Sequence, residues 1–172
     1  MREATDIQIR RRTTDDLDAC ESMAEQVRAR DGYPSFLGDG GLRAFLQPDD
    51  AVDAWVAIHD GGVVGHVVLR PSSAPPSALL AAAELGVAVE QLHFIARLLV
   101  APVARRRGVG GALLEHAVAD ARERGRVPVL DVVTTDTSAL ALYEANRWRR
   151  LGSYDLTLRD GRTMALAVYA AP

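Results

Sequence analysis

The segment from residue 92 to residue 134 most constrains the fold, because it reads as a strand, a glycine-rich turn, a helix and a second strand. Leu92–Val100 is a nearly continuous apolar run, typical of a strand covered on both faces, and Pro102 ends it. Gly108–Arg124 has small or apolar residues at helical spacing, and Val127–Thr134 predicts the next strand. Such a unit places its two strands parallel and adjacent, with a right-handed crossover.

Capping, turn and periodicity signals predict the other elements, and we expect one α/β (α+β) domain over residues 1–172 with a mixed sheet. We treat residues 71–91 as an insertion between two strands. The further predicted elements are a strand over Asp6–Arg12, helices from Thr14 or Asp15 to about Arg30 and over Gly41–Leu46, a hairpin of Ala51–Ile58 and Val63–Leu69, a helix over Ser77–Glu84 closed by Gly86, a helix over Asp136–Asn146, and a hairpin of Trp148–Leu158 and Arg162–Tyr169.

The composition excludes several classes of protein. All 20 basic residues are arginine, so the chain has no lysine for a P-loop or for Schiff-base chemistry. Cys20 is the single cysteine, which excludes an internal disulfide and a zinc cluster of paired thiolates. No apolar stretch approaches about 18 residues, so we expect a cytoplasmic protein that does not enter a membrane. A net charge of −3 and an aromatic content of 5% make nucleic acid a poor default partner.

The glycine-rich turn predicts an anion site. Gly108, Gly110 and Gly111 let backbone approach a ligand closely, and the N–H groups of the first helical turn lack partners within the helix. Arg105–Arg107 stand where the helix dipole is positive, so a phosphate fits there. A dinucleotide fingerprint would need a third glycine at Leu113, which weakens that alternative. The other alternative is a tight turn with solvated arginines.

Two sequence blocks resemble one known family. Leu98-Leu-Val100-x-Pro102-x-x-Arg105-x-x-Gly108-Val-Gly110 resembles the acetyl-CoA signature of the GNAT family of N-acetyltransferases. Leu130-Asp-Val132 followed by Asp136-x-x-Ala139-x-x-Leu142-Tyr143-Glu144 is similar to the family's second block. Together they cover residues 92 to 152, and the order of elements extends the resemblance over the whole chain.

The resemblance implies a fold, a cosubstrate and site residues. It implies a mostly antiparallel sheet whose central parallel pair is splayed around acetyl-CoA, with helices on both faces, and no metal. Backbone groups of Leu98 and Val100 would bind the pantetheine arm, and Tyr143 would be the general acid that protonates the departing thiolate. The cofactor-binding residues that it implies are Leu98, Leu99, Val100, Arg105, Arg106, Arg107, Gly108, Val109, Gly110, Gly111, Asp136, Ala139 and Tyr143.

The sequence departs from the family pattern at four positions. Asp136 replaces a common asparagine, and Arg147-Trp148 replace glycine and phenylalanine. An arginine with positive φ would be strained, so we expect the turn there to use Asn146 instead. Phe94 stands where many relatives place an acidic base.

The general base therefore has no obvious carboxylate. His93 and Arg97 share one face of an unbulged strand, and His93 titrates in the right range to be the base. The other candidates are Glu90, Gln91, His66 and a chain of water molecules.

We expect the acceptor to be a small-molecule amine or a peptide N-terminus, and we expect its recognition outside the cofactor unit. Tyr33 and Phe36 could wall an acceptor pocket or only anchor a loop, and the insertion is a second candidate region. Two rival functions stay open: a catalytically silent acyl-CoA-binding or sensor domain, and an arginine-patch nucleic-acid module. A homodimer also stays open.

Overall fold

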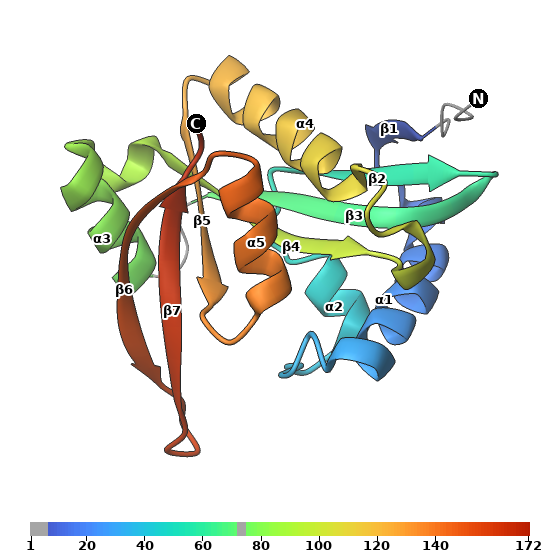
Figure 1. Cartoon of the computed structure of the whole chain (residues 1–172), viewed down its shortest axis with the longest axis horizontal. Helices are drawn as coiled ribbons and strands as arrows, with labels where there is room; N and C mark the ends of the chain where they lie inside the picture. The colour runs from blue at the N-terminus through green and yellow to red at the C-terminus, as the bar shows by residue number, and fades with distance from the viewer. Residues whose placement is uncertain (1–6, 72–74) are drawn as a thin grey trace. The chain divides into compact units, whose positions relative to one another are not determined.

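The computed structural model describes residues 7–71 and 75–172, and within these ranges seven strands form one mixed sheet (Figure 1). The strand order is β1-β2-β3-β4-β5-β7-β6. The strands are β1 (Gln8–Arg11), β2 (Asp53–His59), β3 (Gly62–Pro71), β4 (Leu92–Val100), β5 (Val127–Val133), β6 (Arg149–Thr157) and β7 (Thr163–Ala170). The helices are α1 (Leu17–Asp31), α2 (Gly41–Leu46), α3 (Pro75–Leu85), α4 (Val109–Glu123) and α5 (Thr137–Ala145), with 3-10 turns η1 (Thr14–Asp16), η2 (Val89–Gln91) and η3 (Pro102–Ala104).

The sheet has the parallel central pair that the sequence predicts. Leu92–Phe94 of β4 pair in parallel with Val127–Val129 of β5. The pairs β1–β2, β2–β3, β5–β7 and β6–β7 are antiparallel. The ladder between β4 and β5 is short, and beyond Val129 strand β5 continues to pair with β7 as far as Val133. The mixed, mostly antiparallel fold class is therefore confirmed.

The chain groups into two compact units, each made of two separate segments. Unit 1 comprises Met1–Leu69 and Arg97–Ala117, and unit 2 comprises Arg70–Ala96 and Val118–Pro172. Strand β4 and helix α4 contribute residues to both. The units are described separately below, and the single domain over residues 1–172 stays a prediction.

Helix α4 begins against strand β3 in unit 1 because Gly65 leaves room for it. A Cβ built at Gly65 would lie 2.8 Å from Leu113 Cδ1 and 2.9 Å from Val109 Cγ1. Both of these side chains are buried. The missing side chain of Gly65 thus fixes how closely the first turns of α4 approach the sheet.

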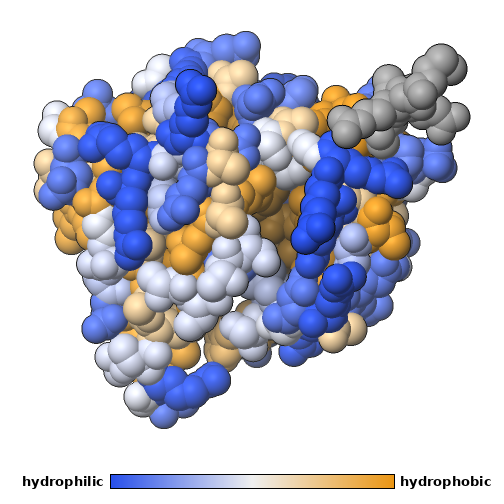
Figure 2. All heavy atoms as spheres, viewed as in Figure 1, coloured by the Kyte–Doolittle hydropathy of each residue, from blue (hydrophilic) through white to orange (hydrophobic). Residues whose placement is uncertain are grey.

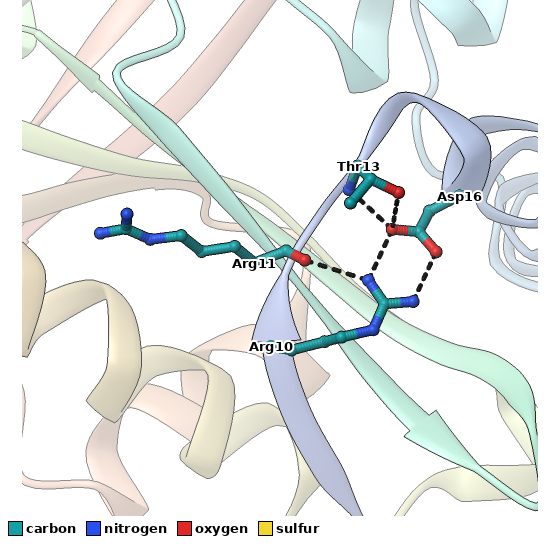
Figure 3. A network of polar contacts seen from close by, with 4 residues as sticks. All are labelled: Arg10, Arg11, Thr13 and Asp16. Atoms are coloured by element: carbon teal, nitrogen blue, oxygen red, sulfur yellow. Dashed lines mark hydrogen bonds and ion pairs between the residues drawn. The ribbon is translucent and has the colours of Figure 1, made fainter.

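The buried carboxylate of Asp16 accepts several hydrogen bonds in the turn between β1 and α1 (Figure 3). Arg10 donates two hydrogen bonds of 2.7 Å to the two carboxylate oxygens of Asp16. The amide and the hydroxyl of Thr13 also donate to this carboxylate, at 2.7 and 3.0 Å. The hydrogen bonds from Arg10, followed by those from Thr13, hold the pKa of Asp16 far below its usual range. The turn is therefore closed by a carboxylate that stays ionised.

Helices cover both faces of the strands of unit 2. Val168 and Ala170 of β7 pack with Ala78 and Ala81 of α3 in one apolar core. Tyr169 lies between them in sequence and therefore faces the other side, where its ring lies 5.9 Å from that of Tyr143 in α5. Helices on both faces are thus present within this unit.

The region predicted as an insertion contains a packed helix. Ser77 of α3 is fully buried, and its hydroxyl donates to Asp131 at 2.6 Å and lies 2.7 Å from the hydroxyl of Tyr154. Burial raises the pKa of Tyr154. Leu80 packs on Gly152, where a Cβ would lie 3.2 Å from Leu80 Cδ1. Helix α3 is therefore part of the core of unit 2; residues 72–74 of the predicted insertion lie outside the described residues.

The surface is mostly hydrophilic on the face drawn in Figure 2, where hydrophobic areas are small and separated. Large exposed hydrophobic side chains include Phe36, Leu79 and Val103. Among the described residues, no helix is both long enough and apolar enough to cross a membrane.

Candidate active site

The turn between β4 and α4, where the sequence predicts an anion site, contains two residues with a left-handed backbone. One turn of 3-10 helix, η3, follows the strand and ends at Ala104, and the next residue, Arg105, is extended. Arg106 and Gly108 are left-handed, with φ of 62° and 80°. A Cβ at Gly108 would meet nothing within 4 Å, so the space on that side of the turn is open. The turn thus fits the predicted approach of an anionic group.

Helix α4 provides N–H groups directly after this turn. It begins at Val109, so Gly110 and Gly111 lie in its first turn. The N–H groups of a first turn have no acceptor within the helix, and the helix dipole makes this end positive. The backbone donors of this first turn therefore directly follow Gly108, beside which the space is open.

Two of the three arginines of the turn have partners in unit 1. The Arg105 guanidinium donates to the carboxylate of Asp31, the last residue of α1, and to the carbonyl oxygen of Val100 at 3.3 Å. The hydrogen bond from Arg105 lowers the pKa of Asp31. Arg107 lies 3.0 Å from His59 Nε2, and Arg106 is exposed. The sequence did not predict Asp31 as a partner, because no local pattern links residues so far apart.

Leu98–Val100, the last three residues of strand β4, belong to unit 1. Leu99 is 1% exposed, whereas Leu98 and Val100 are half-buried. Arg97, just before them, is left-handed with a φ of 56°, and its guanidinium carbon lies 4.2 Å from the centre of the Phe45 ring. The predicted common face of His93 and Arg97 assumed an unbulged strand with regular alternation, and the left-handed backbone at Arg97 departs from that assumption.

The second predicted block lies in unit 2, at helix α5. Asp136 is the N-cap residue, and its carboxylate accepts a hydrogen bond of 3.0 Å from the amide of Ala139. An aspartate thus serves as the cap at the position where an asparagine is common in the family.

Tyr143 lies in an aromatic cluster of unit 2. Its side chain is buried, and its ring centre lies 6.1 Å from that of Trp148 and 5.9 Å from that of Tyr169. The Trp148 amide donates to the Tyr143 carbonyl at 3.0 Å. The Tyr169 hydroxyl is also buried and has no hydrogen-bond partner among the described residues. The rings of Tyr143 and Tyr169 therefore pack against each other.

The turn after α5 differs from the prediction. Arg147 is the left-handed residue, with a φ of 61°, while Asn146 has a φ of −92°. Asn146 instead uses its side-chain amide to donate to the carbonyl of Leu142 at 2.8 Å. Arginine thus adopts the conformation that glycine adopts at little cost.

The base candidates differ sharply in environment. His93 is 8% exposed, and its Nδ1 has no partner within the described chain. Burial and then the charges of Arg126 and Arg124 lower its pKa, opposed by Asp120. The residues that shift the pKa of His93, namely Asp120, Arg124 and Arg126, lie in sequence at or just after the carboxyl end of α4. The glycine-rich turn, in contrast, leads into the amino end of the same helix.

Other candidates are less suited to the role of base. His66 is fully buried, and its two ring nitrogens contact the guanidinium of Arg12 and the carbonyl oxygen of Arg97. Its ring therefore cannot reach an acceptor amine. Glu90 is exposed, and Gln91 uses its side-chain oxygen to accept from the amide of Ala88 at 2.8 Å.

Tyr33 and Phe36, the residues predicted on the acceptor side, differ in environment. Tyr33 packs edge-on against Phe45 with ring centres 5.8 Å apart, whereas Phe36 is 67% exposed. Within the residues that the structure describes, no group of three or more His, Cys, Asp or Glu side chains could hold a metal ion.

Comparisons with known proteins identify the family and the fold of this chain. The model of the acetyltransferase (GNAT) family matches residues 18–147. The ribosomal-protein-S18-alanine N-acetyltransferase of Escherichia coli has 22% identity and a TM-score of 0.62, over 96% of this chain and 93% of that one. The ribosomal-protein-alanine N-acetyltransferase of Brucella melitensis has 22% identity and a TM-score of 0.69, over 95% and 98%.

A third solved structure contains a ligand. The protein yncA of Salmonella typhimurium, solved with its cofactor acetyl-CoA, has 14% identity and a TM-score of 0.69, over 95% of this chain and 92% of that one. No curated protein sequence matches this chain significantly.

Proposed function

Because the chain belongs to the acetyltransferase (GNAT) family, we propose that it is an N-acetyltransferase that moves an acetyl group from acetyl-CoA directly to a primary amine. The turn between β4 and α4 carries the proposal. There, left-handed Arg106 and Gly108 lead into the free N–H groups of a helix, beside open space. These features suit the pyrophosphate of acetyl-CoA. The solved relative that contains acetyl-CoA supports the same cosubstrate.

Each site residue has a proposed role. Backbone N–H groups of residues 106–111 hold the pyrophosphate, and backbone groups of Leu98 and Val100 hold the pantetheine arm as an added strand would. Acetyl-CoA supplies the activated thioester carbonyl. Tyr143 protonates the departing thiolate, since the pKa of a phenol, about 10, lies close to that of a simple thiol.

The amine must lose a proton before or during attack, and His93 is the proposed residue for this step. Burial and the nearby Arg126 and Arg124 lower its pKa, so its imidazole is neutral near pH 7 and can accept a proton. Loss of the proton through water is the alternative. Below its pKa the acceptor amine is mainly protonated, so a base is needed most in that pH range. If His93 is the base, His93→Gln should lower kcat/KM most strongly there. If the proton leaves through water, the substitution should have little effect.

The acceptor class is a small-molecule amine or a peptide N-terminus, within a cytoplasmic setting. Two of the solved relatives are N-acetyltransferases named for alanine of ribosomal proteins, which supports including peptides among the candidates. Thiol release should therefore be screened against amines, amino acids, polyamines, aminoglycosides and peptides. Release that depends on one class of amine supports the proposal.

A calorimetric titration with acetyl-CoA tests the location of the cosubstrate independently of the acceptor. Gly110→Val adds a branched side chain in the first turn of α4 and should weaken binding by about tenfold or more. Unchanged affinity in a folded variant rejects this location.

A catalytically silent acyl-CoA-binding domain is the second candidate function, because Phe94 stands at the position of a common acidic base and is buried. Binding of acetyl-CoA without turnover on any amine favours it. Salt-dependent binding of DNA or RNA that CoA does not affect favours the nucleic-acid module instead.

A further inference from the structure

Three residues of unit 1 form a chain of polar contacts centred on a fully buried histidine. Arg12 follows β1, His66 lies in β3, and Arg97 lies in β4. A terminal guanidinium nitrogen of Arg12 lies 2.9 Å from His66 Nε2, and His66 Nδ1 lies 3.0 Å from the carbonyl oxygen of Arg97. The His66 side chain has no exposed surface. Both of its ring nitrogens are therefore committed to protein groups.

The chemistry of Arg12 fixes the proton on His66. A guanidinium can only donate hydrogen bonds, so Nε2 must accept and the single ring proton must be on Nδ1. Nδ1 then donates to the carbonyl oxygen of Arg97. Burial, and secondarily the charge of Arg12, lower the pKa of His66 to about 4, so this neutral form persists at pH 7.

The carbonyl that His66 holds belongs to an unusual residue. Arg97 has a φ of 56°, a left-handed conformation that is unfavourable for a residue with a side chain. Its guanidinium lies over the ring of Phe45, and its carbonyl is held by His66. Contacts at both ends of Arg97 thus oppose its relaxation to an ordinary strand conformation.

The direction of the next amide follows from the direction of this carbonyl. The carbonyl of Arg97 and the N–H of Leu98 belong to one planar trans peptide group, so they point in opposite directions. A donor that fixes the carbonyl on the His66 side therefore aims the N–H of Leu98 away from His66. Residues 98–100 are those proposed above to bind the pantetheine arm.

We propose that His66 is a positioning residue for acetyl-CoA: it anchors the peptide between Arg97 and Leu98 and so aims the Leu98 N–H at the acyl-pantetheine part of the cosubstrate. This inference rests on the proposed function. It assigns His66 no contact with substrate. Arg12 acts one step further away, by selecting the tautomer of His66 that can donate.

Two substitutions separate the contact with Arg97 from the contact with Arg12. Asparagine places its amide near the position of Nδ1, so His66→Asn can still donate to the Arg97 carbonyl. Glutamine reaches toward the position of Nε2, so His66→Gln can still meet Arg12 but loses the donor to Arg97. ADP is the control ligand, because it contains a pyrophosphate and no pantetheine arm.

Calorimetry should show that His66→Gln weakens acetyl-CoA binding by about tenfold and leaves ADP binding within about twofold of wild type. His66→Asn should stay within about threefold for both ligands. Unchanged acetyl-CoA binding by His66→Gln, or equal loss of both ligands, overturns the inference. Wild-type protein that binds ADP but not acetyl-CoA rejects the proposed function, and this inference with it.

A second measurement needs no variant. Acetyl-CoA should slow hydrogen exchange of the Leu98 amide in the wild-type protein, measured by NMR, because the amide becomes a donor to the ligand. ADP should leave that exchange unchanged. Equal exchange of this amide with and without acetyl-CoA, in protein that binds acetyl-CoA by calorimetry, overturns the inference while leaving the proposed function intact.

Discussion

Gly65 of β3 and Leu113 of α4 approach each other so closely that a Cβ on residue 65 would lie 2.8 Å from Leu113 Cδ1. Gly65→Ala should therefore push the amino end of α4 away from the sheet. Since that end carries the proposed pyrophosphate site, the variant should bind acetyl-CoA more weakly and lose about 1–3 kcal/mol of unfolding free energy through overpacking. Calorimetry and chemical denaturation measure the two effects.

Gly38→Ala is the matched control for this substitution, because a Cβ there would meet nothing within 4 Å. It should change neither stability nor binding. If Gly65→Ala behaves like this control, close packing at Gly65 does not determine the position of α4.

Tyr143→Phe removes one hydroxyl and keeps the ring that packs on Trp148 and Tyr169. If the phenol protonates the thiolate, kcat should fall by about 100-fold while acetyl-CoA affinity and Tm change little. Steady-state kinetics on an acceptor found in the screen, with calorimetry and thermal melting, test this.

Tyr169→Phe is the control, because it deletes the neighbouring buried hydroxyl, which has no hydrogen-bond partner among the described residues. It should keep the wild-type kcat. Near-wild-type turnover of Tyr143→Phe, with chemistry as the slow step, would remove Tyr143 from the catalytic residues.

Arg147→Gly should stabilise the protein by about 1 kcal/mol, because arginine occupies a left-handed conformation at φ 61° that glycine adopts without steric cost. The side chain is exposed, so little packing is lost. Denaturant titration measures the change. Arg149→Gly, at an exposed position within β6, should instead destabilise. Destabilisation by both variants would mean that Arg147 contributes more than its backbone strain costs.

Asp16→Asn should lower the free energy of unfolding at pH 7 by about 1 kcal/mol, a modest value because the Arg10 side chain is 40% exposed. The folded-state pKa of Asp16 is depressed, so its stabilisation is present above the unfolded-state pKa of about 3.9 and declines as pH falls below it. The difference between variant and wild type should therefore shrink below about pH 4, as denaturation curves at several pH values would show. Asp15→Asn, next to it and exposed, should be neutral at pH 7. A difference that is constant with pH would contradict a role for the charge.

The elements around the proposed site follow from short-range signals in the sequence. Strand β4 spans Leu92–Val100 as predicted, since its apolar run and Pro102 mark both ends. Helix α2 spans Gly41–Leu46 as predicted, and Gly125 follows α4 with a positive φ. Such signals involve neighbours in the chain, and the sequence displays them directly.

Contacts between distant residues could not be predicted in this way. Asp31 and Arg105 are separated by 74 positions, and His66 and the carbonyl of Arg97 by 31. Neither pair is marked by a pattern of spacing. For the same reason, the sequence predicted His66 as a candidate base. The burial of its side chain and its contacts with Arg12 and Arg97 depend on residues that are distant in sequence.

The division of the chain into two discontinuous units limits how the protein can be dissected. A fragment that holds all of unit 1 must run from its first segment to Ala117, and it then carries residues 70–96, which belong to unit 2 and include α3. A fragment that holds all of unit 2 must begin at Arg70, and it then carries residues 97–117 of unit 1. No single cut yields two pieces with one whole unit each. Neither unit can therefore be exchanged with that of a relative as one contiguous segment, and an exchange of either whole unit would have to replace two stretches of the gene together.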